Sequence, residues 1–422
     1  MAAPSNGEVR VQARYDVIVV GAGLAGLFAG TLAARRGART LVVARGQGGL
    51  QLGPGTIDVW GYAGADHALV ESPAAALAAL ADSQYPLAVA GQPALAEALG
   101  ELQALAGAAG YALRGTLDRN HYLPTALGAV RPTCLAPETL LAGEVRAPGE
   151  LTLADVADFR DFFAPLAAAN LRAAGYPARA LPLELPRLPT QREAFATDVA
   201  RLFDQPAYRA EVAERWRPQL EGVTRLGVPA VLGLAPTTTA WQELSDRLGV
   251  AVFEVPLPPP SVPGIRLYDV VRGALERAGG RLIIGPSVTG WVGEDNTTRG
   301  VHAATGGHRR TYAARHVILA TGGFRHGGLD APTPGQAREG VFDLPVATGA
   351  EWFAPLYWQP HPYVRFGLRT DGHLRVLGAD GRPWSNVRAV GGLLAGADRN
   401  SQGCREGVDL ATAYRAVQTL EL

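Results

Sequence analysis

Short apolar runs separated by glycine mark the beginning of the chain. Tyr15–Val20 is apolar at nearly every position, which is typical of a parallel strand buried on both faces. Leu24–Arg36 then has helical spacing and stops at Gly37, and Thr40–Ala44 is a second apolar run. This order predicts a strand–helix–strand unit whose right-handed crossover places both strands in one parallel sheet.

The middle of the chain has a different pattern. Arg45–Gly64 is rich in glycine and proline, and a loop of this length in a compact domain is usually either functional or disordered. Ala74–Ala112 is rich in alanine and leucine and is predicted to be mostly helical. Ala154–Ala174 and Gln191–Arg217 have the spacing of amphipathic helices. Residues 110–250 contain no glycine fingerprint, so we expect an inserted, mainly helical lobe there that serves a substrate or a partner.

Elements like those at the start return in the last third of the chain. A helix is predicted at Leu267–Ala278 and a short strand at Arg281–Gly285. Trp291–Tyr312 alternates polar and apolar residues around two turns, as a small antiparallel meander does. His316–Ala320 is another buried strand, and a last helix is expected from about Arg405 to Leu420.

The order of these elements predicts an α/β fold class. Residues 15–109 and 251–422 would form one Rossmann-type domain with a parallel sheet and a small antiparallel meander, and residues 110–250 would form the inserted lobe. Residues 1–14 are polar and are read as a disordered leader.

The turn between the first strand and the first helix carries a nucleotide-binding fingerprint. Gly21 allows the sharp turn, Gly23 lets the backbone approach a pyrophosphate, and Gly26 lets the helix pack closely on the strand. Leu24 and Ala25 open the helix, whose free N–H groups and positive end favour a phosphate. Because a buried strand precedes the fingerprint and a helix follows it, we favour nucleotide binding over a glycine turn without a ligand.

The acidic residue that usually follows the second strand is missing. Ala44 and Arg45 stand where an Asp or Glu normally binds the ribose hydroxyls of FAD or NAD. Arg45 could instead meet the 2′-phosphate of NADP or the terminal phosphate of a mononucleotide, or it could be a solvated side chain. FMN is therefore a candidate beside FAD.

Two further glycine clusters favour a flavin. Thr321, Gly322 and Gly323 follow a buried strand and resemble a turn that approaches the cofactor in two-domain flavoproteins. A third cluster comprises Gly396, Gly403, Cys404 and Gly407. The helix that begins there would direct its N-terminus at the flavin O2 region, where reduction develops negative charge.

The composition of the chain excludes several kinds of partner and active site. The chain has 39 basic and 39 acidic residues, and every basic residue is an arginine. A formal net charge of zero argues against nucleic acid or an anionic membrane as a partner, and the absence of lysine excludes P-loop and Schiff-base lysines. Cys134 and Cys404 are too few to ligate an iron–sulfur cluster or a structural zinc, so no metal site is expected. Val17–Ala34 is uncharged, but its four glycines favour a strand and turn over a membrane span.

Several short motifs carry a family resemblance over essentially the whole chain. They are Arg45–Gln47, Gly55–Asp58, Leu127–Gly128, Arg131–Thr133, Phe162–Leu171, Gly227–Gly233, Phe366–Asp371 and Gln402–Cys404. Their shared order resembles the flavoproteins of the succinate dehydrogenase and fumarate reductase family. More closely, it is similar to the B subunits of anaerobic glycerol-3-phosphate dehydrogenases.

The resemblance implies a flavin, with FMN placed first and FAD as the alternative. It implies oxidation of sn-glycerol 3-phosphate to dihydroxyacetone phosphate, with electrons passed to quinone. An FAD-bearing A subunit and an iron–sulfur C subunit that docks at the membrane would be the partners. The chain would be cytoplasmic, or peripheral at the inner membrane through a partner. The residues that would line the flavin by carry-over are Gly21, Gly23, Gly26, Arg45, Gly46, Gly55, Thr56, Thr321, Gly322, Gly403 and Gly407.

The sequence offers no clear acid–base pair for alcohol oxidation. His361 and Arg365, near the expected lobe junction, are the catalytic candidates, and His121 and Arg131 have the same status. Arg405 and Glu406 stand where the family tends to have glycines. Two other functions stay open, which are a stand-alone flavin oxidoreductase with another substrate and a scaffold subunit that has lost its cofactor.

Overall fold

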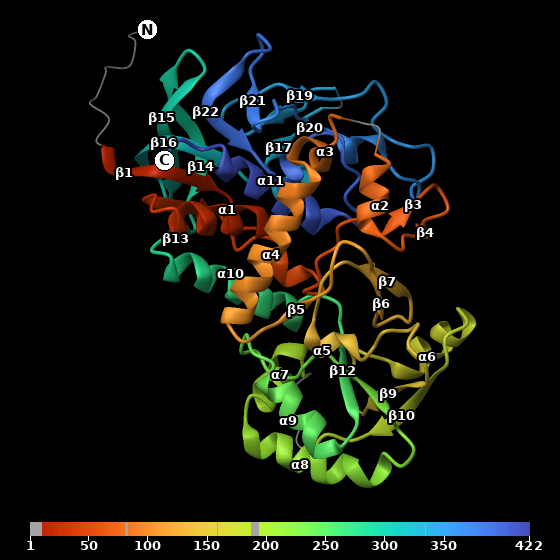
Figure 1. The fold of residues 1–422 in the computed structure, drawn as a ribbon. Coiled ribbons are helices and arrows are strands. Elements are labelled where there is room, and N and C mark those ends of the chain that lie inside the picture. The colour runs from red at the N-terminus through yellow and green to blue at the C-terminus, as the bar shows by residue number, and fades with distance from the viewer. Residues whose placement is uncertain (1–10, 81–82, 158, 187–193, 334) are drawn as a thin grey trace.

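The first predicted strand lies at the middle of the larger sheet (Figure 1). The protein is seen here as a computed structural model that describes residues 11–80, 83–157, 159–186, 194–333 and 335–422. β1 (Val11–Val20) pairs in parallel with β2 (Thr40–Ala44) and with β16 (His308–Leu319). β13 (Arg281–Ile284) continues the sheet beyond β2, and β22 (Pro383–Ala389) continues it beyond β16, again in parallel. The five strands therefore end at one edge of the sheet.

The predicted meander joins this sheet through β16. The first half of β16 pairs antiparallel with β15 (Thr297–Thr305), which pairs in turn with β14 (Ser287–Glu294). β1 pairs with β16 from Thr311 to its end, and β22 pairs with the last residues of β16. β21 (Arg375–Leu377) adds an antiparallel edge to β22. The meander begins earlier than the sequence predicts, at Ser287. It also ends later, because β16 runs without a break into the predicted strand at His316–Ala320.

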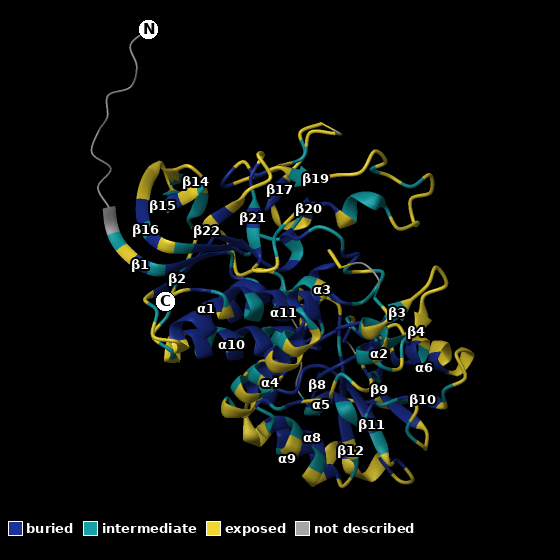
Figure 2. Cartoon of the chain, turned by 45° about the horizontal axis from the view of Figure 1, so that its top comes forward, coloured by how far each residue is buried: buried dark blue, intermediate teal, exposed yellow. Residues whose placement is uncertain are grey.

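Helices pack on the parallel part of the sheet. α1 (Leu24–Arg35) contacts α10 (Val262–Arg277) and α11 (Arg405–Gln418), and α4 (Gln92–Ala108) contacts both of these. Figure 2 shows the central strands and α1 in the colour of buried residues. The shorter elements of this part are α2 (Pro73–Ala78), α3 (Pro86–Ala90), β3 (Tyr62–Ala63), β4 (Ala68–Leu69), β17 (Leu329–Asp330), β18 (Arg338–Glu339), β19 (Val346–Ala347) and β20 (Gly367–Leu368).

The second lobe, at the bottom of Figure 1, is built on a sheet that the sequence did not predict. Four parallel strands lie in the order β10 (Ala178–Leu183), β9 (Leu151–Val156), β11 (Arg225–Pro229) and β12 (Ala251–Val255). Its helices are α5 (Glu138–Leu141), α6 (Ala164–Ala173), α7 (Ala196–Phe203), α8 (Pro206–Trp216) and α9 (Thr239–Leu248). Between the lobes lie β5 (Leu113–Arg114), β6 (His121–Pro124), β7 (Val130–Thr133) and β8 (Ala136–Pro137).

Two expectations therefore need correction. The lobe is α/β and not mainly helical, and the helix expected at Ala154–Ala174 is β9 followed by α6. Leu151–Ala154 is buried throughout, and periodicity cannot distinguish such a short apolar run from a helix. The core of this lobe draws on residues from Tyr122 to Val262, whereas residues 15–135 and 267–420 supply the other core.

The start of the chain also differs from the expectation. Val11–Arg14, expected to belong to a disordered leader, form the first part of β1. The remainder of the expected leader, residues 1–10, lies outside the described residues. In the ranges that the structure does describe, no helix has the length and apolar character needed to cross a bilayer.

A buried ion pair joins the two lobes. Arg266 on α10 and Glu254 on β12 are 0% and 1% exposed, and their two contacts measure 2.6 and 3.0 Å. The Arg266 Nε–H also donates to the Gly233 carbonyl at 2.8 Å, and the Leu232 N–H donates to Glu254 at 2.9 Å. Arg266 of α10 thus makes its hydrogen bonds to the second lobe, and Glu254 has partners from both lobes, so the pair fixes how the two lobes are oriented.

Candidate cofactor-binding site

An elongated cavity of about 440 Å³ lies at the edge where the parallel strands end. Ala44, Val20, Ala320 and Val390 line it at or just beyond the ends of β2, β1, β16 and β22. Strands in a sheet are about 4.8 Å apart, so these four ends span about 14 Å. Ser287 at the start of β14 lines the cavity as well. The carboxyl edge of an open parallel sheet is the place where α/β proteins bind nucleotides.

The glycine fingerprint shapes the middle of this cavity. A Cβ at Gly21, where φ is +118°, would lie 2.2 Å from the Ala320 carbonyl oxygen, so β1 and β16 meet only with glycine there. A Cβ at Gly26 would lie 2.0 Å from the Gly21 carbonyl oxygen. Gly23, in contrast, faces open space, because no atom lies within 4 Å of its Cβ position. The first two glycines therefore serve packing, and Gly23 leaves the cavity open at the N-terminus of α1.

Two loops complete the wall around that helix start. Gly48 and Gly49 follow β2, and a Cβ at Gly48 would lie 2.6 Å from the Gly23 Cα. Thr321 and Gly322 follow β16 on the other side. The first N–H groups of α1 have no acceptor within the helix, so they are free to bind an anion between these loops.

The charged side chains of the cavity carry an excess of positive charge. The lining contains six of them, which are Arg45, Arg325, Arg399, Arg405, Glu406 and Asp409. Four are basic and two are acidic, so the excess is two positive charges. Burial lowers the pKa of His326, which also lines the cavity, and the surrounding arginines lower it further, so this imidazole adds no charge at neutral pH. A pyrophosphate carries two negative charges, which match the excess.

Both acidic side chains of the cavity lining form ion pairs with arginines. Arg399 pairs with Asp409 at 2.5 Å, and Arg405 pairs with Glu406 at 2.6 Å. Burial raises the pKa of Asp409 to about 6 in spite of Arg399. Arg45 has no hydrogen-bond or ion-pair partner within the described part of the chain, and the same is true of Arg325. These two arginines are therefore free to bind phosphate.

Comparisons with known proteins agree with this geometry. A family model for FAD binding domains matches residues 16–408. The probable B subunit of anaerobic glycerol-3-phosphate dehydrogenase from Halobacterium salinarum is 34% identical over 420 residues, covering 95% of this chain and 96% of that relative. The B subunit of the same enzyme from Pectobacterium atrosepticum is 31% identical, covering 96% and 98%. The chain belongs to this family of B subunits.

Membership confirms the expected family and the expected flavin-dependent oxidoreductase. The Rossmann-type α/β fold class is confirmed as well. The solved 3-ketosteroid delta1-dehydrogenase of Sterolibacterium denitrificans has a TM-score of 0.44 and 14% identity, covering 96% of this chain and 99% of that one.

The structure brings two of the three predicted glycine clusters to the cavity. The predicted residues that line it are Gly21, Gly23, Leu24, Ala25, Arg45, Gly46, Thr321 and Gly322. Those that do not line it are Gly26, Gly55, Thr56, Gly323, Gly396, Gly403, Cys404 and Gly407. No residue of the third cluster lines the cavity, but other residues of α11, the helix that begins within this cluster, do.

Packing explains where the other glycines lie. A Cβ at Gly55 would be 2.8 Å from Pro263, and a Cβ at Gly407 would be 2.9 Å from the Val59 Cα. Cys404 is buried and lies 3.1 Å from the hydroxyl of Tyr85. Gly55 therefore lets the loop after β2 pack on α10, and Gly407 lets the same loop pack on α11.

The histidine and arginine proposed for catalysis lie elsewhere. His361 accepts a hydrogen bond from the Ala354 N–H through Nδ1, and its Nε2 bonds the Tyr357 carbonyl, both at 2.9 Å. It therefore closes a loop and has no ring nitrogen free for a substrate. Arg365 lines a separate cavity of about 420 Å³, together with Gly396.

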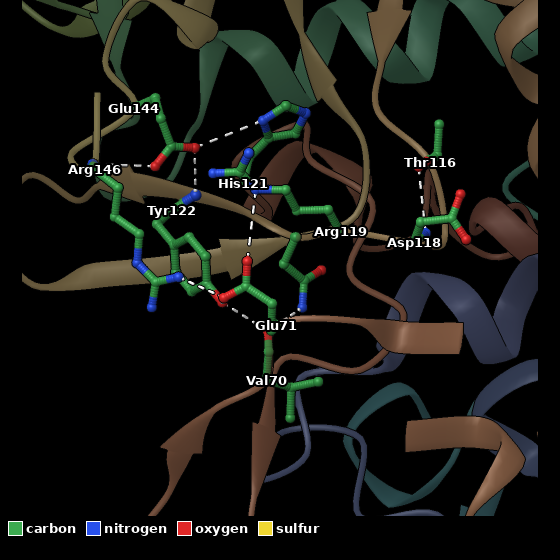
Figure 3. Close-up of polar contacts among 10 residues, drawn as sticks. Val70, Glu71, Thr116, Asp118, Arg119, His121, Tyr122, Glu144 and Arg146 are labelled. Carbon is green, nitrogen blue, oxygen red and sulfur yellow. Dashed lines mark hydrogen bonds and ion pairs between the residues drawn. The ribbon is translucent and has the colours of Figure 1, made fainter. Parts of the chain in front are cut away.

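The other two candidates lie at the lobe junction. Figure 3 shows His121 directed at Glu144, with its Nδ1 3.7 Å from the carboxylate, in a cluster that contains Glu71 and Arg146. Arg131, on β7, forms an ion pair with the buried carboxylate of Asp58. His121 and Arg131 therefore do not line the cavity, but Arg131 belongs to a charged group that reaches the start of α11.

Sequence reasoning missed much of the charged lining. Arg399 and Asp409 come together only because the loop before α11 folds back on that helix, and Arg325 follows a turn whose glycines alone pointed to the cofactor. Glu406 stands out in the sequence only as a departure from the family, and it lines the cavity in a B subunit. Arg45 after the second strand, and Arg405 and Glu406 at the start of the last helix, were the signals of this wall in the sequence.

Proposed function

We propose that this chain is the FAD-binding B subunit of a glycerol-3-phosphate dehydrogenase. The observation that carries the proposal is the cavity with two excess positive charges at the N-terminus of α1. It continues on both sides of that helix start, to Ser287 beyond β2 and to Asp409 on α11. An FMN with its phosphate at α1 would use only one side. The extent of the cavity and the family model therefore support FAD in place of the FMN that the resemblance placed first.

In this proposal the two ends of the cavity bind different parts of FAD. Ala44 and Ser287 would hold the adenosine, and Arg45, which stands where the usual ribose carboxylate is missing, would contact the phosphates from that side. Gly23 and the free N–H groups at the start of α1 would hold the pyrophosphate, and the first turn of α11 would border the isoalloxazine. When bound, the flavin supplies a two-electron acceptor for the carbon that is oxidised. The N-terminus of α11 would stabilise the negative charge that reduction develops on the flavin.

The names of the relatives supply the substrate and the setting. Both are anaerobic glycerol-3-phosphate dehydrogenase subunits, so we propose oxidation of sn-glycerol 3-phosphate to dihydroxyacetone phosphate within a multi-subunit complex. Electrons would pass to quinone through an FAD-bearing A subunit and an iron–sulfur C subunit at the inner membrane. Two buried cysteines far apart in sequence support a separate subunit as the carrier of iron–sulfur clusters.

Reduction by substrate tests this function. The purified chain, loaded with FAD and kept free of oxygen, should lose its flavin absorbance when sn-glycerol 3-phosphate is added, and sn-glycerol 1-phosphate is the matched control. Re-oxidation by a quinone should require the partner subunits. A flavin that dithionite bleaches but sn-glycerol 3-phosphate leaves unchanged, both alone and in the assembled complex, would refute the proposal.

A further inference from the structure

A second cavity, of about 420 Å³, has only positive charges in its lining. Arg365 and Arg369 line this arginine cavity, and no acidic residue that the structure describes lines it. Neither guanidinium has a hydrogen-bond or ion-pair partner in the described ranges. Asp371 is the acidic residue nearest to them in sequence, but it pairs with Arg375 at 2.8 Å. The arginine cavity therefore has two excess positive charges and no counter-charge among its lining residues.

The backbone that carries both arginines is held in place. The Gly396 N–H donates to the Arg365 carbonyl at 2.8 Å, and the Leu377 N–H donates to the Arg369 carbonyl at 3.1 Å. A Cβ at Gly367, between the two arginines, would lie 2.5 Å from the backbone just before Gly396, so only glycine allows this contact. Both arginines are exposed. The protein therefore fixes where these side chains start and leaves their ends free for a ligand.

The chemistry of the lining suits a phosphate group. A guanidinium presents its N–H donors in a planar fork that matches two phosphate oxygens. Thr348 and Thr370 line the same cavity, and their hydroxyls can donate as well. A phosphate monoester carries about 1.5 to 2 negative charges at neutral pH, which match two arginines, whereas a carboxylate carries only one. Most of the remaining lining is apolar, which suits a small carbon body and not a second charged group.

The arginine cavity adjoins the cofactor cavity. Gly392 lines the cofactor cavity and Leu394 lines the arginine cavity, so the two linings come within two residues, or at most about 7 Å between Cα atoms. The Cβ position of Gly396 lies 3.8 Å from the Tyr85 Cα, and the Tyr85 hydroxyl lies 3.1 Å from the sulfur of Cys404, which precedes α11. The arginine cavity is thus on the side of α11, the helix that would border the isoalloxazine.

We propose that Arg365 and Arg369 bind the phosphate of sn-glycerol 3-phosphate in the arginine cavity. This inference rests on the proposed function. One oxygen and one carbon separate the phosphorus from the carbon that is oxidised, so the phosphate site has to adjoin the flavin site, as the arginine cavity does. Arg45 and Arg325 are also unpaired, but they line the cofactor cavity, where FAD brings its own phosphates. Inorganic phosphate has the same chemistry as the substrate group, and it serves as the probe.

Three variants of the FAD-loaded chain test the assignment. Arg365→Gln and Arg369→Gln each remove one charge from the arginine cavity and keep a polar side chain. Arg310→Gln is the matched control, because Arg310 is an exposed arginine of β16 that lines neither cavity. Calorimetry measures the binding of inorganic phosphate while FAD occupies the cofactor cavity. Anaerobic mixing of the chain, or of its assembled complex, with sn-glycerol 3-phosphate gives the dissociation constant of the substrate and the limiting rate of flavin reduction.

The proposal predicts that Arg365→Gln and Arg369→Gln each raise the dissociation constants of inorganic phosphate and of sn-glycerol 3-phosphate about tenfold or more. The limiting rate of reduction should stay within about threefold of the wild type, because the arginines hold the phosphate and not the carbon that reacts. Arg310→Gln should keep both dissociation constants within about twofold. Inorganic phosphate should raise the apparent dissociation constant of sn-glycerol 3-phosphate for the wild type without lowering the limiting rate.

The contrary results can be told apart. Unchanged binding of phosphate and substrate in both cavity variants would overturn the inference alone, and so would a lower limiting rate without weaker binding. Phosphate that binds at the arginines without competing with sn-glycerol 3-phosphate would assign the cavity to a separate anion and overturn its link to the substrate. A wild type that sn-glycerol 3-phosphate does not reduce, alone or in the complex, would overturn the proposed function and this inference with it, even if the arginines still bind phosphate.

Discussion

Alanine at two glycines of the fingerprint should separate cofactor binding from folding. At Gly23 the backbone is extended, with φ −76° and ψ −177°, and no atom lies within 4 Å of the Cβ position. Gly23→Ala should therefore change the free energy of unfolding of the flavin-free protein by less than about 0.5 kcal/mol. At Gly26 a Cβ would lie 2.0 Å from the Gly21 carbonyl oxygen, which is backbone and cannot move aside. Gly26→Ala should therefore cost about 3 kcal/mol or more.

The effects on flavin binding should be reversed in order. The new methyl group of Gly23→Ala projects into the cavity where the pyrophosphate approaches the helix N-terminus. Displacing the phosphate weakens its hydrogen bonds to N–H groups, and such bonds to a charged group are worth about 1.5–3 kcal/mol. The FAD dissociation constant of Gly23→Ala should thus rise about ten- to a hundredfold.

Two measurements check this pair. Chemical denaturation of both flavin-free variants gives the unfolding free energies, and quenching of FAD fluorescence during titration gives the dissociation constants. The reasoning is refuted if Gly23→Ala binds FAD as the wild type does. It is also refuted if Gly23→Ala is destabilised as much as Gly26→Ala. That result would show that Gly23 is needed for folding and not for binding the cofactor.

Three further predictions concern the charges and thiols. Glu254→Gln leaves the buried Arg266 unpaired and should lower the unfolding free energy by about 3–5 kcal/mol in urea denaturation, and an unchanged midpoint would contradict this. Arg45→Gln removes one of the two unpaired positive charges and should weaken FAD binding about tenfold or more in the same titration, and an equal dissociation constant would exclude a phosphate contact. Burial raises the pKa of both Cys134 and Cys404 to about 12, so only about 1 in 10,000 of each is thiolate at pH 8. Ellman's reagent should then find both thiols only after unfolding, and fast reaction of the native protein would show that one is accessible.

The local parts of this fold were predictable from the sequence. The turn at Gly21 and Gly23 depends on backbone conformation and on the strand and helix beside it, and all of these are adjacent in the chain. The meander and the last helix were found for the same reason. The sheet of the second lobe was not found, because Leu151–Val156 is short and buried, and its pairing partners lie far away in sequence.

The site was predictable only in part. Glycines were assigned to the cofactor wherever they clustered, but Gly55 and Gly407 are needed where chain segments pack together. The charges that line the cavity depend on contacts between distant segments, as with Arg399 and Asp409. The burial of Glu406 at the start of α11 depends on such contacts as well. Composition and spacing carry no information on either the contacts or the burial.

The identity of the bound cofactor tests the central claim most directly. The chain, purified from its own complex, is denatured by heat, and the released small molecule is identified by its mass and counted against the protein. The geometry of the cavity predicts FAD, at about one per chain. Release of FMN would contradict the assignment of the adenosine end, and a folded chain without any flavin would contradict the whole account.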